Sequence, residues 1–189
     1  MTAVLVAYAS RMGSTAEIAE AVGATLREAG LTVTVCRCDE VGTLDGYDAV
    51  LLGSAMYVRH WEREAVEFLE RFGAQLTSRP TWLFQSGPCG EDAATQEVST
   101  PRKVHRLVQR FDLRPPVTFG GRLDPAAAKD RLSRWVATGS MEGDFRDWDA
   151  IRVWARGCAH AIVSASEGVR SDLRPPDGGP RWPSPSPSS

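Results

Sequence analysis

The chain lacks long apolar runs and has little excess charge of either sign. None of its hydrophobic stretches approaches the roughly 20 residues that a transmembrane helix needs, and its formal net charge is only −2. This near balance gives no argument for nucleic acid or an acidic membrane surface as a partner. The sequence runs from Met1 directly into a strand-like segment, so we expect no signal peptide and a cytoplasmic protein.

Cysteine is scarce, and its spacing does not suggest a metal site. The four cysteines are Cys36, Cys38, Cys89 and Cys158, and no two of them form a C-x-x-C pair. We therefore predict no bound metal and interpret the cysteines as buried or half-buried thiols in a reducing compartment.

Two common phosphate-binding motifs are also absent. The chain contains no G-x-x-x-x-G-K-[ST], and no G-x-G-x-x-G follows its first apolar segment. A P-loop and a dinucleotide fingerprint are therefore excluded.

What the sequence does contain is a hydroxyl-rich turn between a predicted strand at 3–8 and a predicted helix. The turn is Ser10, Arg11, Met12, Gly13, Ser14 and Thr15. The apolar stripe of the helix is Ile18, Ala19, Val22, Leu26 and Ala29. A turn that opens a helix directs unpaired backbone N–H groups and the positive end of the helix dipole at one point. This arrangement favours phosphate.

A second interpretation competes for the same residues. Ser14-Thr15-Ala16-Glu17 fits a capping box, with Ser14 as N-cap and the Glu17 side chain reaching back. The capping box accounts for Ser14 and Glu17, but it does not account for Ser10, Gly13 and Thr15 together. Both interpretations stay open on the sequence.

The rest of the chain predicts alternating strands and helices. Strands are predicted at 31–36, 47–53, 80–85 and 116–120, and the last long helix at 146–166. The other two helices have the apolar stripes Trp61, Ala65, Phe68, Leu69 and Phe72, and Val104, Leu107, Val108 and Phe111. This alternation predicts an α/β fold with five parallel strands and helices on both faces, in three layers. Ligands bind such folds beyond the carboxyl ends of the strands.

The turn, together with the segments that follow the third and fourth predicted strands, resembles the flavodoxins. These segments are 53–61 and 86–92, and both are rich in Gly and small residues. The resemblance implies a flavodoxin-like doubly wound sheet of order 2-1-3-4-5 that binds FMN. The cofactor-binding residues it implies are Ser10, Arg11, Met12, Gly13, Ser14, Thr15, Ser54, Ala55, Met56, Tyr57, Ser86, Gly87, Pro88, Cys89 and Gly90.

Within this family the chain looks similar to the flavodoxin-type, menaquinone-dependent protoporphyrinogen dehydrogenases. The similarity lies in Gly53-Ser54-Ala55-Met56-Tyr57 followed by His60-Trp61, in the segment 146–151, and in an insertion at 124–145. It implies an FMN-dependent oxidoreductase with a quinone-linked or porphyrin-like substrate and possible peripheral membrane contact. The alternatives are an electron-transfer flavodoxin without a substrate of its own and a non-flavin phosphate-binding domain. No catalytic residue is assigned.

The predicted organisation is one domain at 1–166 followed by a Pro- and Ser-rich tail at 167–189, which we expect to be disordered. The insertion at 124–145 is predicted to be helical. Its apolar face, Leu132, Trp135 and Val136, packs on the domain in one interpretation and forms a lid or an interface in the other.

Overall fold

The computed structural model describes residues 1–87, 99–123 and 143–172, with side chains described up to residue 166. The elements follow in the order β1 Ala3–Ala9, α1 Ser14–Glu28, β2 Thr32–Arg37, η1 Cys38–Glu40, β3 Ala49–Tyr57, β4 His60–Trp61, α2 Arg63–Leu76, β5 Thr81–Ser86, α3 Arg102–Arg110, β6 Val117–Phe119, β7 Arg122–Leu123, β8 Gly143–Asp144 and α5 Trp148–Asp172.

The central sheet has the strand order β2-β1-β3-β5-β6, and all four of these pairings are parallel. This confirms the predicted order 2-1-3-4-5, because β5 and β6 are the fourth and fifth strands of the prediction. From β1 the chain moves to β2 on one side and then to β3 on the other. The carboxyl ends of β1 and β3 therefore flank the switch point where α/β folds bind ligands.

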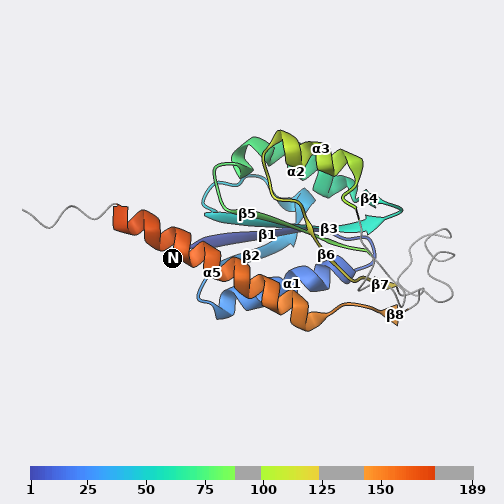
Figure 1. Cartoon of the computed structure of the whole chain (residues 1–189), viewed down its shortest axis with the longest axis horizontal. Helices are drawn as coiled ribbons and strands as arrows, with labels where there is room; N and C mark the ends of the chain where they lie inside the picture. Colours follow the sequence, from blue (N-terminus) through green and yellow to red (C-terminus); the bar gives the residue numbers. More distant parts are fainter. Residues whose placement is uncertain (88–98, 124–142, 173–189) are drawn as a thin grey trace, which may run out of the picture.

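Alternating side chains of β1 separate the two halves of the core. Leu5 and Ala7 pack on the face covered by α2 and α3, whereas Val4 and Val6 pack on the face covered by α1 and α5. Figure 1 shows these helix pairs on opposite faces of the sheet. The three-layer α/β/α prediction is confirmed, because successive residues of a strand point to opposite faces.

The third strand is longer than predicted. It was expected at 47–53 but runs from Ala49 to Tyr57, then turns back into β4. Trp61, which was expected on a helix, is therefore a buried strand residue, and its indole N–H donates to Gln85 Oε1 at 2.8 Å. The Gln85 amide in turn donates to Thr118 Oγ1 at 2.9 Å. These hydrogen bonds satisfy the fully buried side-chain amide of Gln85 and explain why Trp61 lies in a strand and not in the helix that follows.

The last helix also differs at both ends from its prediction at 146–166. It begins at Trp148 because the Asp147 carboxylate accepts from the backbone N–H groups of Asp149 and Ala150, at 3.0 and 2.9 Å. It continues to Asp172, six residues past the boundary at which a tail was predicted. The remainder of that tail and most of the insertion at 124–145 lie outside the described residues.

The cysteine side chains that the structure describes are free thiols whose protonated form is favoured by burial. Cys36, Cys38 and Cys158 are free, and burial raises the pKa of each, that of Cys158 to about 12. Cys38 lies in η1 instead of continuing the strand that holds Cys36. Within the described part of the chain, no helix is long and apolar enough to cross a membrane.

Close packing at Gly53 in β3 predicts one severe core substitution. A Cβ added to Gly53 would lie 2.1 Å from Cζ of Phe84, whose ring is fully buried. We expect Gly53→Ala to lower the free energy of unfolding by roughly 1–3 kcal/mol in a denaturant titration, because the ring has no free volume to move into. The control is Gly42→Ala, where a Cβ meets no atom within 4 Å, and the change should stay within about 1 kcal/mol. Equal stability of the two variants would show that the ring can move aside.

Candidate functional site

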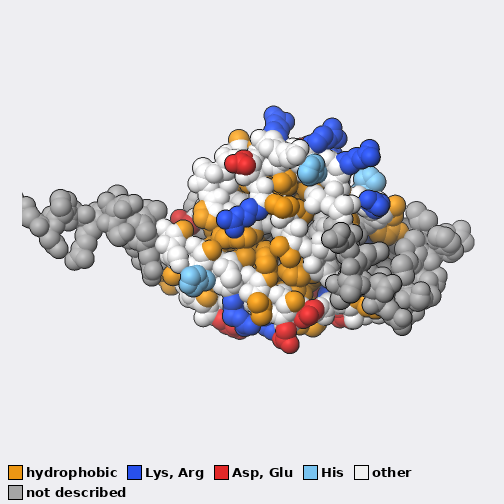
Figure 2. All heavy atoms as spheres, viewed as in Figure 1, with side chains coloured by type: hydrophobic (Ala, Val, Ile, Leu, Met, Phe, Trp, Pro, Cys, Tyr) orange, Lys and Arg blue, Asp and Glu red, His pale blue; other side chains and the backbone are white. Residues whose placement is uncertain are grey.

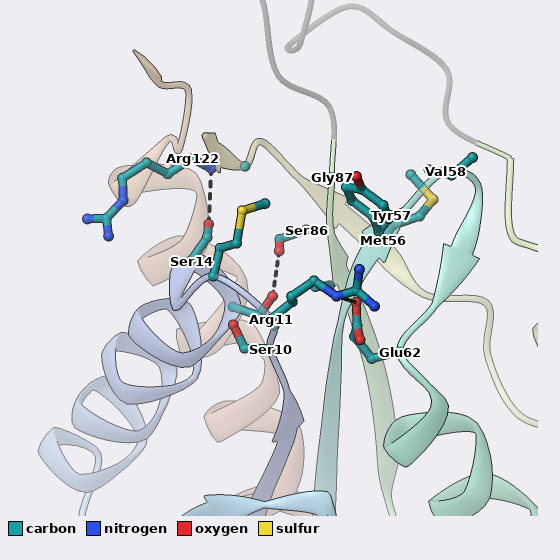
Figure 3. A pocket seen from close by; sticks show the side chains of 14 residues that line it. Ser10, Arg11, Ser14, Met56, Tyr57, Val58, Glu62, Ser86, Gly87 and Arg122 are labelled. Carbon is teal, nitrogen blue, oxygen red and sulfur yellow. Dashed lines mark hydrogen bonds and ion pairs between the residues drawn. The ribbon is translucent and has the colours of Figure 1, made fainter. Parts of the chain in front are cut away.

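A pocket opens at the switch point of the sheet, between the start of α1 and the carboxyl ends of β3 and β5 (Figure 3). Its volume of about 230 Å³ lies just below the range of about 300–1,000 Å³ typical of ligand pockets. This size suits a ligand that remains partly exposed. The lining residues are Ser10, Arg11, Met12, Ser14, Thr15, Ala55, Met56, Tyr57, Val58, Glu62, Ser86, Gly87, Gly121 and Arg122.

The turn before α1 presents backbone donors to this pocket. Gly13 is the N-cap residue and has a left-handed backbone, with φ of 86°, which glycine adopts without a Cβ clash. Its own N–H donates to Ser10 Oγ at 3.1 Å, and its carbonyl accepts the first helical bond from the Glu17 N–H at 3.0 Å. The N–H groups of Ser14, Thr15 and Ala16 precede that bond, so the helix gives them no acceptor. They form the donor set that an anion requires.

The capping-box interpretation of this turn is wrong. Because Gly13 takes the N-cap position, Ser14 is already helical, and its Oγ accepts the backbone N–H of Arg122 at 3.1 Å. The Glu17 carboxylate binds Arg122 and Arg146, at 3.1 and 2.8 Å, and does not reach back to the turn. No side chain therefore caps the N-terminus of α1, which leaves the anion-binding interpretation.

A pair of buried hydroxyls joins α1 to the central sheet. Thr15 Oγ1 and Ser86 Oγ lie 2.7 Å apart, and both residues are buried at the wall of the pocket. One hydroxyl donates to the other, so the remaining proton of the pair is free to point at a ligand. This contact fixes the helix N-terminus against the end of β5.

One wall of the pocket is a strained hairpin. Met56 and Tyr57 pair with Trp61 and His60 across a two-residue turn, Val58-Arg59. Both turn residues have positive φ, 47° and 61°, as a type I′ turn requires. A β-branched residue is rare in this conformation. Strain of this kind gathers where function fixes the backbone, and here it holds the Tyr57 ring beside the pocket.

A charged pair lies at the base of that wall. The Arg11 guanidinium sits between the Tyr57 ring and Glu62 (Figure 3), 5.0 Å from the ring centroid and 3.6 Å from the carboxylate. The Glu62 side chain is only 14% exposed. Burial raises the pKa of Glu62, and the nearby Arg11 opposes that rise. Tyr57 Oη is buried and has no hydrogen-bond partner among the described residues.

A buried arginine holds the opposite rim. The Arg146 side chain is 2% exposed and binds the carboxylates of Glu17 and Asp144 at 2.8 and 2.6 Å, and its guanidinium lies 4.4 Å from the centroid of the Trp148 ring. The Arg146 guanidinium lowers the pKa of Asp144. Since the same Glu17 also binds Arg122, this network ties β7 and β8 to α1 and fixes the residues that close the pocket.

Most of the predicted cofactor residues that the structure describes meet at this pocket. Ser54 does not line it: its hydroxyl is buried, donates to the Ala55 carbonyl and accepts the N–H of Glu62. Gly13 acts through its backbone, and Pro88, Cys89 and Gly90 lie outside the described residues. The sequence missed Val58, Glu62, Gly121 and Arg122. The segment 53–61 was a signal for Val58, and the Gly-rich segment after the fifth predicted strand was a signal for the last two, whereas Glu62 had none.

The residues that line the pocket suit a phosphate monoester attached to a flat ring. The unpaired N–H groups and hydroxyls form one end, and Met56, Tyr57 and Gly87 form the other. The described residues contain no group of three or more His, Cys, Asp or Glu side chains that could hold a metal. FMN carries one phosphate and a planar isoalloxazine, so the residues present fit it.

Solved structures with this fold are distant in sequence. A flavodoxin from the domain Archaea aligns with 86% of this chain and 99% of its own, with a TM-score of 0.56 and 13% identity. A short-chain flavodoxin associated with a bacterial microcompartment aligns with 86% of this chain and 99% of its own, with a TM-score of 0.57 and 16% identity. Rubredoxin oxygen:oxidoreductase from Desulfovibrio gigas aligns with a TM-score of 0.58 and 14% identity. The alignment covers 87% of this chain but only 37% of that protein. At these identities the similarity establishes the fold.

Membership is established by the sequence itself. The model of the flavodoxin domain family matches residues 5–126, more than half of the chain, from the first strand through the turn and both walls of the pocket. The cofactor of the family is FMN, which the residues that line the pocket fit. The chain therefore belongs to the flavodoxin domain family.

Proposed function

We propose that the protein is an FMN-dependent oxidoreductase that couples electron transfer to proton transfer on a quinone-linked or porphyrin-like substrate. The observation that carries the proposal is the half-buried Glu62 carboxyl, which lies at the pocket wall 3.6 Å from Arg11 and whose pKa is raised by its partial burial. Perturbed carboxyls of this kind gather at sites of proton transfer. The choice of substrate class rests on the resemblance of the 53–61 segment to protoporphyrinogen dehydrogenases.

The residues of the pocket divide into three roles. The N–H groups of Ser14 and Thr15, with the hydroxyls around them, bind the phosphate. Met56 and Tyr57 orient the ring, and Glu62 holds or releases a proton at its carboxyl. FMN, when bound, supplies the redox chemistry by accepting two electrons as a hydride or one at a time.

Arg11 sets the balance at Glu62. Burial favours the neutral acid, whereas the guanidinium 3.6 Å away favours the carboxylate. A carboxyl held between these opposing effects changes protonation when a neighbouring charge changes. A proton carrier beside a redox ring needs this property, and a relay of single electrons does not.

The second candidate is an electron-transfer flavodoxin without a substrate. The exposed Val58 at the tip of the hairpin, 67% accessible, favours it because a carrier works with an uncovered ring edge. The two candidates separate in one assay on flavin-loaded protein. The enzyme turns over a quinone or a porphyrinogen, whereas the carrier only exchanges electrons with artificial donors.

The cofactor itself provides the first test. We expect the purified protein to bind FMN, with the yellow flavin spectrum, and to bind FAD far more weakly, because the pocket offers one phosphate site. The measurement is a fluorescence titration of the apoprotein with each flavin. A protein that FMN fails to titrate would refute both candidates.

The hydroxyl pair provides the second. Thr15→Val keeps the shape of the side chain but removes the hydroxyl that meets Ser86 at 2.7 Å. Hydrogen bonds to charged groups contribute about 1.5–3 kcal/mol, so FMN affinity should fall roughly tenfold or more. The control is Thr15→Ser, which restores the hydroxyl and should restore most of the affinity. An unchanged affinity in Thr15→Val would mean that the pair only supports the helix.

The carboxyl provides the third. The pKa of Glu62 is raised in the folded protein, so the folded state prefers the protonated carboxyl. The protonated carboxyl therefore contributes stability at pH values below the pKa of Glu62 in the unfolded chain. This contribution is lost as the pH rises through the pKa of Glu62 in the folded protein. The free energy of unfolding of Glu62→Gln apoprotein, relative to the parent, should therefore rise as pH increases from about 4 toward neutrality. Urea titrations at several pH values measure it.

The matched control for this measurement is Glu20→Gln, at an exposed position in the middle of α1, away from both ends of the helix dipole. Its difference from the parent should show no comparable rise with pH. If Glu62→Gln behaves in the same way as this control, Glu62 is an ordinary carboxylate and the proton-transfer role fails. On flavin-loaded protein, the same variant should alter the pH profile of turnover.

A further inference from the structure

One helix of this nearly neutral protein carries charge of a single sign. The solvent face of α3 presents Arg102, Lys103, Arg106 and Arg110, and the helix contains no Asp or Glu. Figure 2 shows Lys and Arg side chains along the upper edge of the molecule, where Figure 1 places α3.

This charge pattern is unfavourable for the helix itself. Arg102 and Lys103 occupy its first turn, where the dipole is positive and acidic residues are preferred. Arg102, Arg106 and Arg110 follow at intervals of four, so each repels the next along the same face. A pattern that opposes local stability in this way indicates a role in binding anions.

A groove joins this face to the hairpin of the flavin pocket. Its basic residues are Arg59 and Arg63 on one side and Arg102, Lys103 and Arg106 on the other, and we call it the basic groove. Its two carboxylates are already paired, Glu67 with Arg63 at 3.6 Å and Glu70 with Lys103 at 2.9 Å. Within the described residues, Arg102 and Arg106 have no carboxylate partner.

The basic groove reaches the rim of the flavin pocket. Val58, at the tip of the hairpin, lines both the pocket and the groove, and Arg59 follows it directly. Anything bound in the groove therefore lies beside the exposed edge of the pocket. This position suits a partner that exchanges electrons with the ring.

We propose that the basic groove docks an acidic segment of a redox partner protein, an inference that rests on the proposed function as a flavin oxidoreductase. A flavin that is reduced or oxidised by one molecule must exchange electrons with a second. Complementary charge steers such an encounter and fixes its orientation.

The shape and chemistry of the groove favour a protein over a lipid surface or a nucleic acid. A recess with basic walls receives a protruding segment, whereas a flat anionic bilayer would meet only the outermost side chains. A nucleic acid is disfavoured because α3 has no Phe, Tyr or Trp side chain on which bases could stack.

The test is a charge reversal with a matched control. Arg102→Glu/Arg106→Glu reverses two adjacent positions on the solvent face of α3. Arg152→Glu/Arg156→Glu makes the same change in net charge at the same spacing on α5, on the opposite face of the sheet. The binding partner used is a fluorescently labelled oligo-glutamate peptide, followed by anisotropy at low and at physiological salt, with the full chain in FMN-loaded and apo forms.

We expect the parent and the α5 variant to bind the peptide alike, and the α3 variant to bind it at least tenfold more weakly. Binding to the parent should weaken as salt rises, since the contacts are exposed. Arg102→Glu places an acidic residue in the first turn of α3, where the helix dipole favours it, so unfolding is not the expected cause of the loss. Thermal unfolding of each variant checks this point.

Three outcomes would overturn the proposal. They are no binding by the parent, equal loss in both variants, or tighter α3-dependent binding to anionic phospholipid vesicles or labelled DNA than to the peptide. Failure of the proposed function gives a different result: the protein would not bind FMN, while peptide binding by the apo form would still report on the groove.

Discussion

The site depends on one constraint, which is that the first N–H groups of α1 have no acceptor within the helix. The left-handed Gly13 places Ser14 inside the helix and leaves its N-terminus without a side-chain cap. Glu17, which could have served as part of a cap, is held by Arg122 and Arg146 instead. The turn is thus kept in a conformation whose unsatisfied donors are able to bind an anion, and the rest of the pocket is arranged around that point.

Two sets of contacts keep these donors aimed at the pocket. The Thr15–Ser86 hydroxyl pair fixes α1 to the end of β5, and the buried Arg146 joins α1 to β8. Across the pocket, the strained turn at Val58-Arg59 holds Tyr57 beside Arg11 and Glu62. In the proposed function, anion binding therefore belongs to the wall formed by α1, whereas ring binding and proton transfer share the wall formed by the hairpin. The basic groove begins where the ring wall ends, which brings the proposed partner to the same edge of the sheet.

Sequence periodicity was sufficient for the architecture but not for the ends of elements. Alternating strands and helices predicted the parallel sheet with helices on both faces, because buried parallel strands and amphipathic helices leave strong local patterns. The strand order itself followed from the resemblance to flavodoxins. The apolar character of Trp61 placed it on a helix, although it pairs in β4, since a short apolar segment fits either structure. The decisive contact, from the Trp61 indole to Gln85, joins residues far apart in the chain. The same limit applies to Ser14, whose capping role was a sound local inference that the long-range bond from Arg122 overrides.

The sequence by itself determined the fold class, the hydroxyl-rich turn and its position after the first strand, because each depends on the pattern of residues that are neighbours in the chain. It also identified Tyr57 and Ser86 as pocket residues, since both follow the ends of adjacent strands. Only the tertiary structure decided that Glu62 and Arg11 share the wall of that pocket, that Ser54 turns away from it, and that Arg59 and Arg102 line one groove. These relations depend on the turn of a hairpin and on the packing of helices far apart in the chain. Burial, which raises the pKa of Glu62, exists only once those elements have come together.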